Sequence, residues 1–361
     1  MLYLLSKIME KFSFFSSIYL RGFLAFLISF VLMIILGKPF INYLKKKKYG
    51  ESIREDGPMS HLSKKGTPTM GGVLIIVVVL ITNILTGDLS NYYNLFLMLV
   101  TILFASIGFV DDYKKFTVNK KGLSGKKKLL GQFAIGVLIW LFLILLKTPE
   151  LEGLEFALIN PLNSDKYISL GIIGMLFFIG LVITGSSNAV NITDGLDGLA
   201  IMPVVISSFI LATIAYFTGH TVLSEHLKLI YIPGSGEIAI YLVSICGAGL
   251  GFLWYNFYPA QIFMGDTGSL TLGGILGTVA ILLKQELLLP VIGGIFVFEA
   301  LSVIIQVASF KLRGKRVFKM APIHHHFELR GQLETKVTMR FWIISIMCGI
   351  LALGLIRLRG I

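Results

Sequence analysis

The stretch LFLMLVTILFASIGFVDD (residues 95–112) decides the fold. Its first part, from Leu95 to Val110, is almost entirely apolar, and two adjacent carboxylates, Asp111 and Asp112, end it. With a few flanking residues, such a run is long enough for a helix to cross the hydrocarbon core of a bilayer, which is roughly 30 Å thick. The two carboxylates then lie at the membrane edge, where ionisable residues are costly and usually functional.

The rest of the chain has the same apolar character. Of its 361 residues, 55% are hydrophobic and 14% are charged, and the mean hydropathy is +0.83. These values predict an all-α, polytopic integral membrane protein with a single domain over residues 1–361. Apolar runs separated by short polar segments predict ten transmembrane helices, near residues 20–40, 70–86, 94–110, 129–147, 168–186, 198–217, 237–254, 267–283, 287–310 and 338–357.

Positive charge is concentrated in three predicted loops, which all fall on one side of a ten-helix bundle. Because loops rich in Lys and Arg stay on the cytoplasmic side of a membrane, we predict that this side is cytoplasmic and that both termini lie outside. The basic residues are Lys45–Lys48, Arg54, Lys64 and Lys65 in the first loop, Lys114, Lys115, Lys120, Lys121 and Lys126–Lys128 in the second, and Lys311, Arg313, Lys315, Arg316, Lys319, Arg330, Lys336 and Arg340 in the third.

Several classes of protein have no support in the sequence. Both cysteines, Cys246 and Cys348, sit inside apolar runs, which favours neither a disulfide framework nor a zinc site. The chain has no G-x-x-x-x-G-K-[ST] segment, no dinucleotide-binding fingerprint after a strand and no H-E-x-x-H. Nothing therefore indicates ATP hydrolysis, dinucleotide chemistry or zinc-protease catalysis.

Asp111 and Asp112 have two interpretations. They can be a solvated helix end beside lysines such as Lys115. Alternatively, because adjacent carboxylates repel one another, one can have a raised pKa and accept a proton, or both can help to hold a hard cation. Both of these functional roles suit phosphate chemistry.

Further oxygen-bearing side chains occur in other loops of the same predicted face. Asn191, Asp194 and Asp197 recur every three residues, so in a helix they would share one face, whereas in turns they would cap or shape the backbone. Asp266 follows Met264-Gly265 at the start of an apolar run, which predicts a tight turn that opens a helix. An aspartate there is either a helix cap or a ligand that holds a metal against a phosphate.

The last predicted inner loop contains the three consecutive histidines His324, His325 and His326. Consecutive side chains point in different directions, so a three-histidine zinc site is disfavoured. A polar loop can also carry histidines without a function. Contact with phosphates or movement of a proton is the functional alternative.

Oxygen ligands, many lysines and a location at the membrane edge together favour a Mg²⁺-dependent reaction on a phosphate or diphosphate that meets a lipid. Phosphoryl transfer depends mainly on positioning and charge stabilisation, which such residues supply. With no ATP motif, the simplest reaction is an exchange of one phosphoester or anhydride for another. The attack of a polyprenyl phosphate on a nucleotide-linked sugar is such an exchange.

At this point the chain resembles a known family, the phospho-N-acetylmuramoyl-pentapeptide transferases (MraY) of the polyprenyl-phosphate N-acetylhexosamine-1-phosphate transferase superfamily. The resemblance covers almost the whole chain, with five segments in family order on one predicted face. The segments are Lys64-Lys-Gly-Thr67-Pro68-Thr69-Met-Gly-Gly72, Asp111-Asp112-Tyr113, Asn188 to Gly198, Asn256 to Gly268, and Pro322-Ile-His324-His325-His326-Phe327-Glu328.

The resemblance implies an enzyme of the bacterial inner (cytoplasmic) membrane whose active site is formed by cytoplasmic loops. It would transfer phospho-MurNAc-pentapeptide from UDP-MurNAc-pentapeptide to undecaprenyl phosphate, giving lipid I and UMP, the first membrane step of peptidoglycan synthesis. Mg²⁺ is the implied cofactor, and the implied partners are the two substrates and the lipid bilayer, with no nucleic acid. The oligomeric state stays open, with a homodimer as one candidate.

The resemblance also assigns expected roles to individual residues. Asp266 would ligate the metal, Asp111 and Asp112 would serve the lipid phosphate, one of them as a base, and His325 would take part in catalysis. The remaining substrate-binding residues would be Lys64, Thr69, Lys115, Lys128 (or its neighbour Lys127), Asn191, Asp194, Asp197, Asn256, Phe263 (by stacking on uracil), His324 and His326. The family's ninth helix is broken, and here a break is expected near Glu299.

Two rival functions remain at the level of sequence. A sister transferase that accepts UDP-GlcNAc would share the aspartates, although the Pro-Thr-Met-Gly-Gly segment and the His-His-His-Phe-Glu run favour MraY. A transporter could use membrane acids to carry protons or cations, but it predicts acids near the midplane and inverted repeats. Here the acids gather at one interface and no repeat is found.

Overall fold

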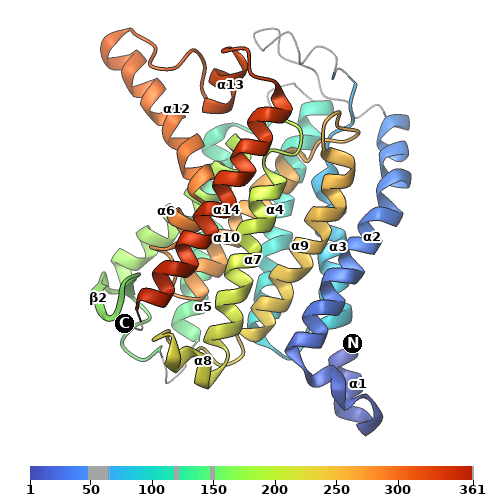
Figure 1. Cartoon of the computed structure of the whole chain (residues 1–361), viewed down its shortest axis with the longest axis vertical. Coiled ribbons are helices and arrows are strands. Elements are labelled where there is room, and N and C mark those ends of the chain that lie inside the picture. Colours follow the sequence, from blue (N-terminus) through green and yellow to red (C-terminus); the bar gives the residue numbers. More distant parts are fainter. Residues whose placement is uncertain (48–63, 65, 118–121, 147–150, 360–361) are drawn as a thin grey trace.

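A computed structural model describes residues 1–47, 64, 66–117, 122–146 and 151–359. Within these ranges the protein is mainly a bundle of long helices (Figure 1). Parts of the first two basic loops, with Lys48, Arg54, Lys65, Lys120 and Lys121, lie outside the described residues. The long helices are α2 (Ile18–Lys46), α3 (Gly71–Thr86), α4 (Tyr92–Thr117), α5 (Gly125–Leu145), α6 (Gly171–Thr193), α7 (Ile201–Thr218), α9 (Gly236–Asn256), α10 (Gly265–Leu282), α12 (Gly294–Arg313) and α14 (Glu334–Leu358).

These helices correspond one to one to the ten predicted apolar runs. Nine of them, among the described residues, are long and apolar enough to cross a membrane, and α3 is an apolar helix of 16 residues. The protein is therefore a polytopic, mainly helical membrane protein. Both termini lie toward the lower end of the bundle in Figure 1, opposite the short helix α13 (Ile323–Glu328).

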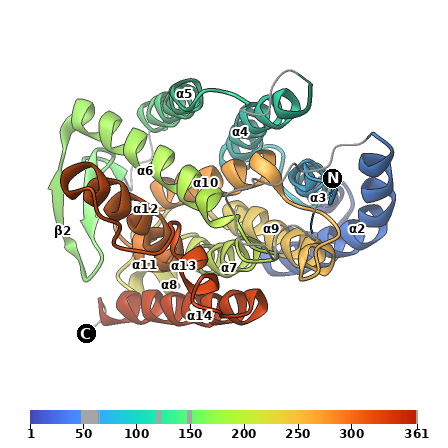
Figure 2. The same ribbon diagram turned by 90° about the horizontal axis from the view of Figure 1, so that it is seen from above.

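Helix α10 occupies the middle of the bundle and packs against α3, α4, α6 and α7 (Figure 2). Glycines allow this close approach: a β-carbon on Gly72 would come within 2.1 Å of the backbone of Gly268, and one on Gly108 within 2.5 Å of the backbone of Thr267. Small residues at such contacts are typical of helices packed in lipid. They bring α3 and α4 directly against the first turn of α10.

Two helices extend further than the sequence indicated. The predicted end of the third span at residue 110 is too early, because α4 continues to Thr117 and contains both Asp111 and Asp112. Likewise α6 continues to Thr193, so Asn191 lies in a helix rather than in a loop, while Asp194 and Asp197 follow it in turns. Polar residues remain in these helices because neighbouring helices supply partners for their side chains.

The outer connections contain structure that the sequence did not reveal. Strands β1 (Ala157–Asn160) and β2 (Asn163–Ser169) form an antiparallel hairpin, and its turn is held by Leu162 N–H donating to Asn160 Oδ1 at 2.8 Å. Short helices occur at Leu2–Ile8 (α1), Glu10–Ser16 (the 3₁₀ helix η1) and Thr221–His226 (α8).

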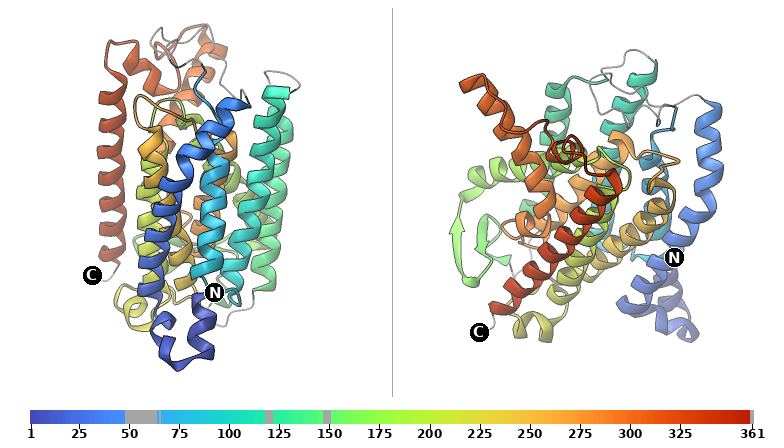
Figure 3. Two further views of the ribbon diagram at one scale, coloured as in Figure 1. Left: turned by 90° about the vertical axis from the view of Figure 1, so that its right-hand side faces the viewer. Right: turned by 45° about the horizontal axis from the view of Figure 1, so that its top comes forward.

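The predicted ninth helix is broken, but not at the expected place. Helix α11 (Leu289–Ile292) ends at Gly293, and α12 begins at Gly294 and leans outward from the bundle (Figures 1 and 3). The expectation of a break near Glu299 is wrong: Glu299 lies inside α12 and is fully buried. Glycine permits the change of direction, whereas a buried glutamate requires specific partners.

Candidate active site

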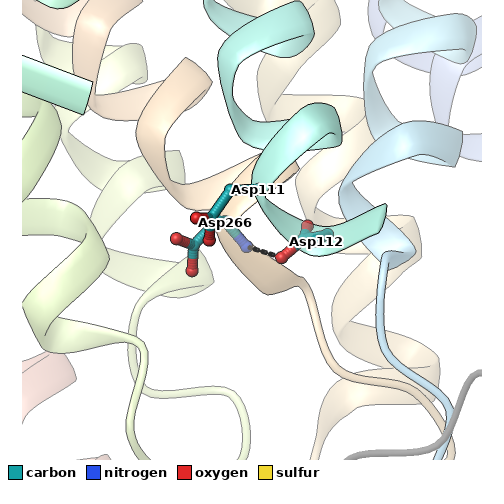
Figure 4. A group of neighbouring side chains, drawn as sticks. All are labelled: Asp111, Asp112 and Asp266. Carbon is teal, nitrogen blue, oxygen red and sulfur yellow. Dashed lines mark hydrogen bonds between the residues drawn. The ribbon is translucent and has the colours of Figure 1, made fainter. Parts of the chain in front are cut away.

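Three carboxylates meet where α4 and α10 cross. Asp111 and Asp112 come from the C-terminal part of α4, and Asp266 comes from the first turn of α10. One ligand atom of each lies within 4.8 Å of those of the other two (Figure 4). Asp111 and Asp112 are buried and Asp266 is half-buried. The structure thus brings together the three aspartates that the sequence singled out.

Asp112 is fixed by the start of α10. Its Oδ1 accepts the backbone N–H of Asp266 at 3.1 Å (Figure 4). Its Oδ2 accepts the backbone N–H and the hydroxyl of Thr267 at 2.8 and 2.7 Å. The first N–H groups of a helix lack partners within the helix, and carboxylates stabilise this end of its dipole. Asp112 therefore caps α10 from a neighbouring helix, which joins the two elements of the site.

Asp111 has a different environment. Its Oδ1 accepts the backbone N–H of Leu123 at 2.6 Å, whereas its Oδ2 lies 2.7 Å from Lys115 Nζ and 2.9 Å from Lys128 Nζ. The second oxygen thus faces two side-chain cations rather than backbone. Side chains can move when a substrate arrives, so this oxygen is the more adaptable one.

Lys115 and Lys128 also connect to Asp266. Lys115 Nζ lies 3.0 Å from Asp266 Oδ1, and Lys128 Nζ lies 2.5 Å from Asp266 Oδ2. The side chains of Lys115 and Lys128 are 32% and 18% exposed, so the cations cover the open side of the carboxylate cluster. Of the two candidate lysines, Lys128 is the one in this cluster, and Lys127 is exposed.

The donor set suits a hard divalent cation. The three carboxylates offer oxygen atoms only, and Mg²⁺ in proteins is typically held by one or two carboxylates together with phosphate oxygens. If all five groups are counted as ionised, the two ammonium groups and three carboxylates leave the cluster with one net negative charge. A cation binding there would replace at least one of the lysine contacts to Asp266.

Asn191 orients Asp266 from the side of α6. Its amide nitrogen donates to Asp266 Oδ1 at 3.1 Å and to Ser269 Oγ at 2.8 Å. Asp194, at the C-terminal end of the same helix, is half-buried. The structure thus joins Asn191 directly to the carboxylate cluster.

A second polar cluster surrounds Asp197. Lys64 Nζ lies 2.6 Å from Asp197 Oδ1 and 2.5 Å from Glu334 Oε1, and Glu334 Oε1 also accepts the backbone N–H of Asp197 at 2.8 Å. Asn256 Oδ1 accepts the backbone N–H of Gly198 at 3.1 Å. These contacts fix the turn after α6 against the N-terminus of α14.

Phe263 and Thr69 lie on two chain segments that pair beside the cluster. Phe263 N–H donates to Pro68 O at 2.8 Å, and Phe263 O accepts Gly71 N–H at 2.8 Å. Phe263 is half-buried and Thr69 is buried. The segment before α3 and the segment before α10 are thereby held together, although they are far apart in sequence.

The three histidines occupy α13 and point to different partners, as their consecutive positions predict. His324 is fully buried, with Nδ1 3.1 Å from Glu299 Oε1. His325 Nδ1 lies 2.8 Å from Glu328 Oε2, and His326 Nδ1 accepts the backbone N–H of Lys319 at 3.0 Å. Burial lowers the pKa of His326, and the nearby Arg330 and Lys319 lower it further.

Sequence reasoning missed two buried acids of this region, Glu299 and Glu334. Glu334 opens α14 and pairs with Lys64, which lies 270 residues earlier. Glu299 looked like a helix-breaking residue in an apolar run. The available signal was the same for both: an acid beside or within a long apolar segment, which is costly unless it is paired.

The sequence of the chain is similar to those of known proteins. Residues 94–284 match the model of the family described as glycosyl transferase family 4, and residues 64–76 match signature 1 of the phospho-N-acetylmuramoyl-pentapeptide-transferases. The chain is also similar to a phospho-N-acetylmuramoyl-pentapeptide-transferase of Fusobacterium nucleatum subsp. nucleatum. The two are 64% identical over 361 residues, which is 100% of each chain.

Proposed function

The chain belongs to the phospho-N-acetylmuramoyl-pentapeptide-transferase family, and we propose that the cluster of Asp111, Asp112 and Asp266 is its reaction centre. The protein is a transferase that moves phospho-MurNAc-pentapeptide from UDP-MurNAc-pentapeptide to undecaprenyl phosphate, which gives lipid I and UMP. The observation that carries the proposal is the convergence of three carboxylates and two lysines at the meeting point of α4, α5 and α10.

We propose that the metal is Mg²⁺ and that Asp266 is its principal protein ligand. Asp266 is the member of the cluster with a half-buried side chain, and Asn191 orients its Oδ1. When bound, the cation would neutralise charge on the diphosphate. Lys115 and Lys128 would add to this neutralisation by contacting the phosphate oxygens once they leave the carboxylates.

Asp111 and Asp112 receive different proposed roles. Asp112 accepts three hydrogen bonds from the first turn of α10 and so acts in positioning Asp266. Asp111 Oδ2 contacts the side chains of Lys115 and Lys128, and these can turn toward a phosphate. Asp111 is therefore the stronger candidate for the group that orients or deprotonates the attacking lipid phosphate.

The nucleotide sugar is proposed to lie over the turns that follow α6. Asp194 and Asp197 come from this segment and Asn191 from the last turn of α6, and the surrounding residues are Lys64, Thr69, Asn256 and Phe263. The ring of Phe263 is a candidate surface for stacking on uracil. The histidines of α13 would contact the sugar-phosphate region, with His325 as the candidate for proton transfer.

We propose that the end of the bundle with the carboxylate cluster faces the cytoplasm and that the protein lies in the bacterial inner membrane. The described basic residues of the three loops, such as Lys45, Lys114 and Lys311, end helices that run toward it, and both termini lie at the opposite end (Figure 1). Because loops rich in Lys and Arg stay on the cytoplasmic side of a membrane, the excess of positive charge at this end supports the proposed orientation. A homodimer remains a prediction that the single chain leaves open.

Release of UMP tests the proposal. Purified protein in detergent is mixed with UDP-MurNAc-pentapeptide and undecaprenyl phosphate, with Mg²⁺ or with a chelator. UMP should form only with both substrates and the metal. Equal turnover after complete removal of divalent metal would contradict the metal assignment, and a preference for UDP-GlcNAc would favour the sister transferase instead.

A further inference from the structure

Glu299 is a buried acid in the mostly apolar first half of α12. Its side chain is fully buried within α12, while its neighbours Phe298 and Leu301 are exposed. A carboxylate in the apolar part of a membrane protein is costly unless partners compensate it, and such residues usually have a function. The partners of Glu299 therefore indicate its purpose.

Both oxygens of Glu299 point to the start of α13. Oε2 accepts the backbone N–H of Ile323 at 3.1 Å, and Oε1 lies 3.1 Å from His324 Nδ1. Helix α13 begins after Pro322, whose side chain cannot cap it. Glu299 thus supplies from α12 the capping acceptor that the sequence of α13 lacks, and its other oxygen lies beside the imidazole of His324.

The other edge of His324 presses on the turn after α6. A β-carbon on Gly195 would come within 2.3 Å of His324 Nε2, so the imidazole lies directly against the backbone of Gly195. Gly195 lies between Asp194 and Asp197, the two acids proposed to face the nucleotide sugar. Contacts therefore lead without interruption from Glu299, through His324, to the substrate-binding turn.

The far end of this turn is fixed by other residues. Asp197 is held by Lys64 and Glu334, and Gly198 is held by Asn256. The Asp194–Gly195 part is bonded to the end of α6, through Asp194 N–H to Asn191 O at 3.3 Å and Gly195 N–H to Thr193 O at 2.8 Å, and it also lies against His324. Loss of Glu299 should therefore displace Asp194 more than Asp197, and it should leave the carboxylate cluster of α4 and α10 in place.

We propose that Glu299 is a positioning residue that sets the Asp194–Gly195 turn for the nucleotide sugar through the imidazole of His324. This inference rests on the proposed placement of the nucleotide sugar. Because Glu299 contacts neither Asp111 nor Asp266 in the described structure, its role is to form the binding surface rather than to act on the reacting atoms.

The test is the substitution Glu299→Gln, which retains the shape of the side chain and an acceptor for Ile323 N–H but removes the negative charge beside His324. We expect the KM for UDP-MurNAc-pentapeptide to rise about tenfold, because the negative charge beside His324 no longer positions the imidazole. The kcat and the KM for undecaprenyl phosphate should each change by less than about twofold. A general structural defect would alter all three values together.

Glu286→Gln is a matched control. Glu286 is also buried, but it lies between α10 and α11 at the opposite end of the bundle, and burial raises its pKa. Glutamine should therefore replace it with little change in either KM. A tenfold rise in the nucleotide-sugar KM for Glu286→Gln as well would overturn the proposal, because the effect would then be general to buried acids.

A double-substitution cycle tests the route through His324. If Glu299 acts through the imidazole, Glu299→Gln should add little to the defect of His324→Gln, and Gly195→Ala should raise the same KM by pushing against Nε2. The inference would be contradicted if the rise in KM for the double variant were the product of the rises for Glu299→Gln and His324→Gln alone. A wild-type KM for Glu299→Gln would also contradict it. Wild-type protein that releases no UMP would instead contradict the proposed function.

Discussion

The two ends of the bundle both bury charged residues, but they arrange them differently. In the first turns of α2 and α9, which begin at the lower end in Figure 1, Arg21 and Glu237 form two contacts at 2.6 and 3.0 Å. Glu237 also accepts the backbone N–H of Asp88. At the upper end, three carboxylates share two lysines that are partly exposed. Burial of charge therefore does not by itself identify a reaction centre.

The two charged clusters differ in the balance of their charges and in the access that a ligand has to them. Arg21 and Glu237 neutralise one another, and Arg21 spends a further N–H on Thr86 O at 3.2 Å, so the pair is closed to a ligand. The carboxylate cluster has an excess negative charge, and its cations lie on the open side. A site that must admit a metal and a diphosphate needs such an imbalance, because a fully paired site has nothing to offer them.

The sharpest way to test this comparison is Asp266→Asn. The substitution keeps the size of the side chain but removes a charge from the proposed metal ligand. We expect UMP release to fall by about a thousandfold, with the protein still folded in detergent. Activity near the wild-type value at saturating Mg²⁺ would remove Asp266 from the ligand set.

The second test separates the two aspartates of α4. Asp111→Asn should reduce kcat about a hundredfold without a change in thermal stability, because it removes the candidate base. Asp112→Asn should reduce kcat and also lower the Tm in detergent, because the α10 cap weakens. Equal losses of kcat and Tm in both variants would show that the two residues have the same, structural role.

A third comparison uses neighbouring lysines. Lys128→Met should reduce kcat/KM for the nucleotide sugar about tenfold, because one charge-assisted contact to phosphate is lost. Lys127→Met, one residue away and exposed, should behave as the wild type. The reverse pattern in the same assay would assign the substrate contact to Lys127.

The smallest effect on catalysis is expected at the opposite end. Glu237→Gln leaves Arg21 buried and unpaired, which should cost about 3–5 kcal/mol in the free energy of unfolding. The kcat of the molecules that remain folded should stay within about twofold of the wild-type value. Thermal unfolding and UMP release measured on the same sample would distinguish the two outcomes, and a loss of kcat without a loss of stability would break the comparison.

The sequence predicts the helical scaffold better than its details. A long apolar run in a bilayer satisfies its backbone hydrogen bonds by forming a helix, which is why each predicted run corresponds to a helix. The sequence predicts ends for α4 and α6 that are too early, because polar residues usually mark the end of an apolar run. Asp112 and Asn191 remain helical because their partners lie on α10, and no local pattern reveals those partners.

The site was predictable where a motif carried it and not where it depends on distant contacts. Asp111, Asp112 and Asp266 were identified from their residue types and positions, and the structure brings them together. Glu299 and Glu334 were missed because their importance follows from partners on other segments. Lys64 precedes Glu334 by 270 residues, and His324 lies on α13, the helix after the one that contains Glu299. The hairpin at Ala157–Ser169 was missed because its strands are short.

Direct measurement of metal binding tests the central claim, that the carboxylate cluster is the metal and phosphate site. Mn²⁺ can replace Mg²⁺ at oxygen ligands, and its electron paramagnetic resonance signal distinguishes free from bound ion. Wild-type protein and Glu237→Gln should bind the ion with the same affinity, and Asp266→Asn should bind it at least about tenfold more weakly. Unchanged binding by Asp266→Asn would contradict the account.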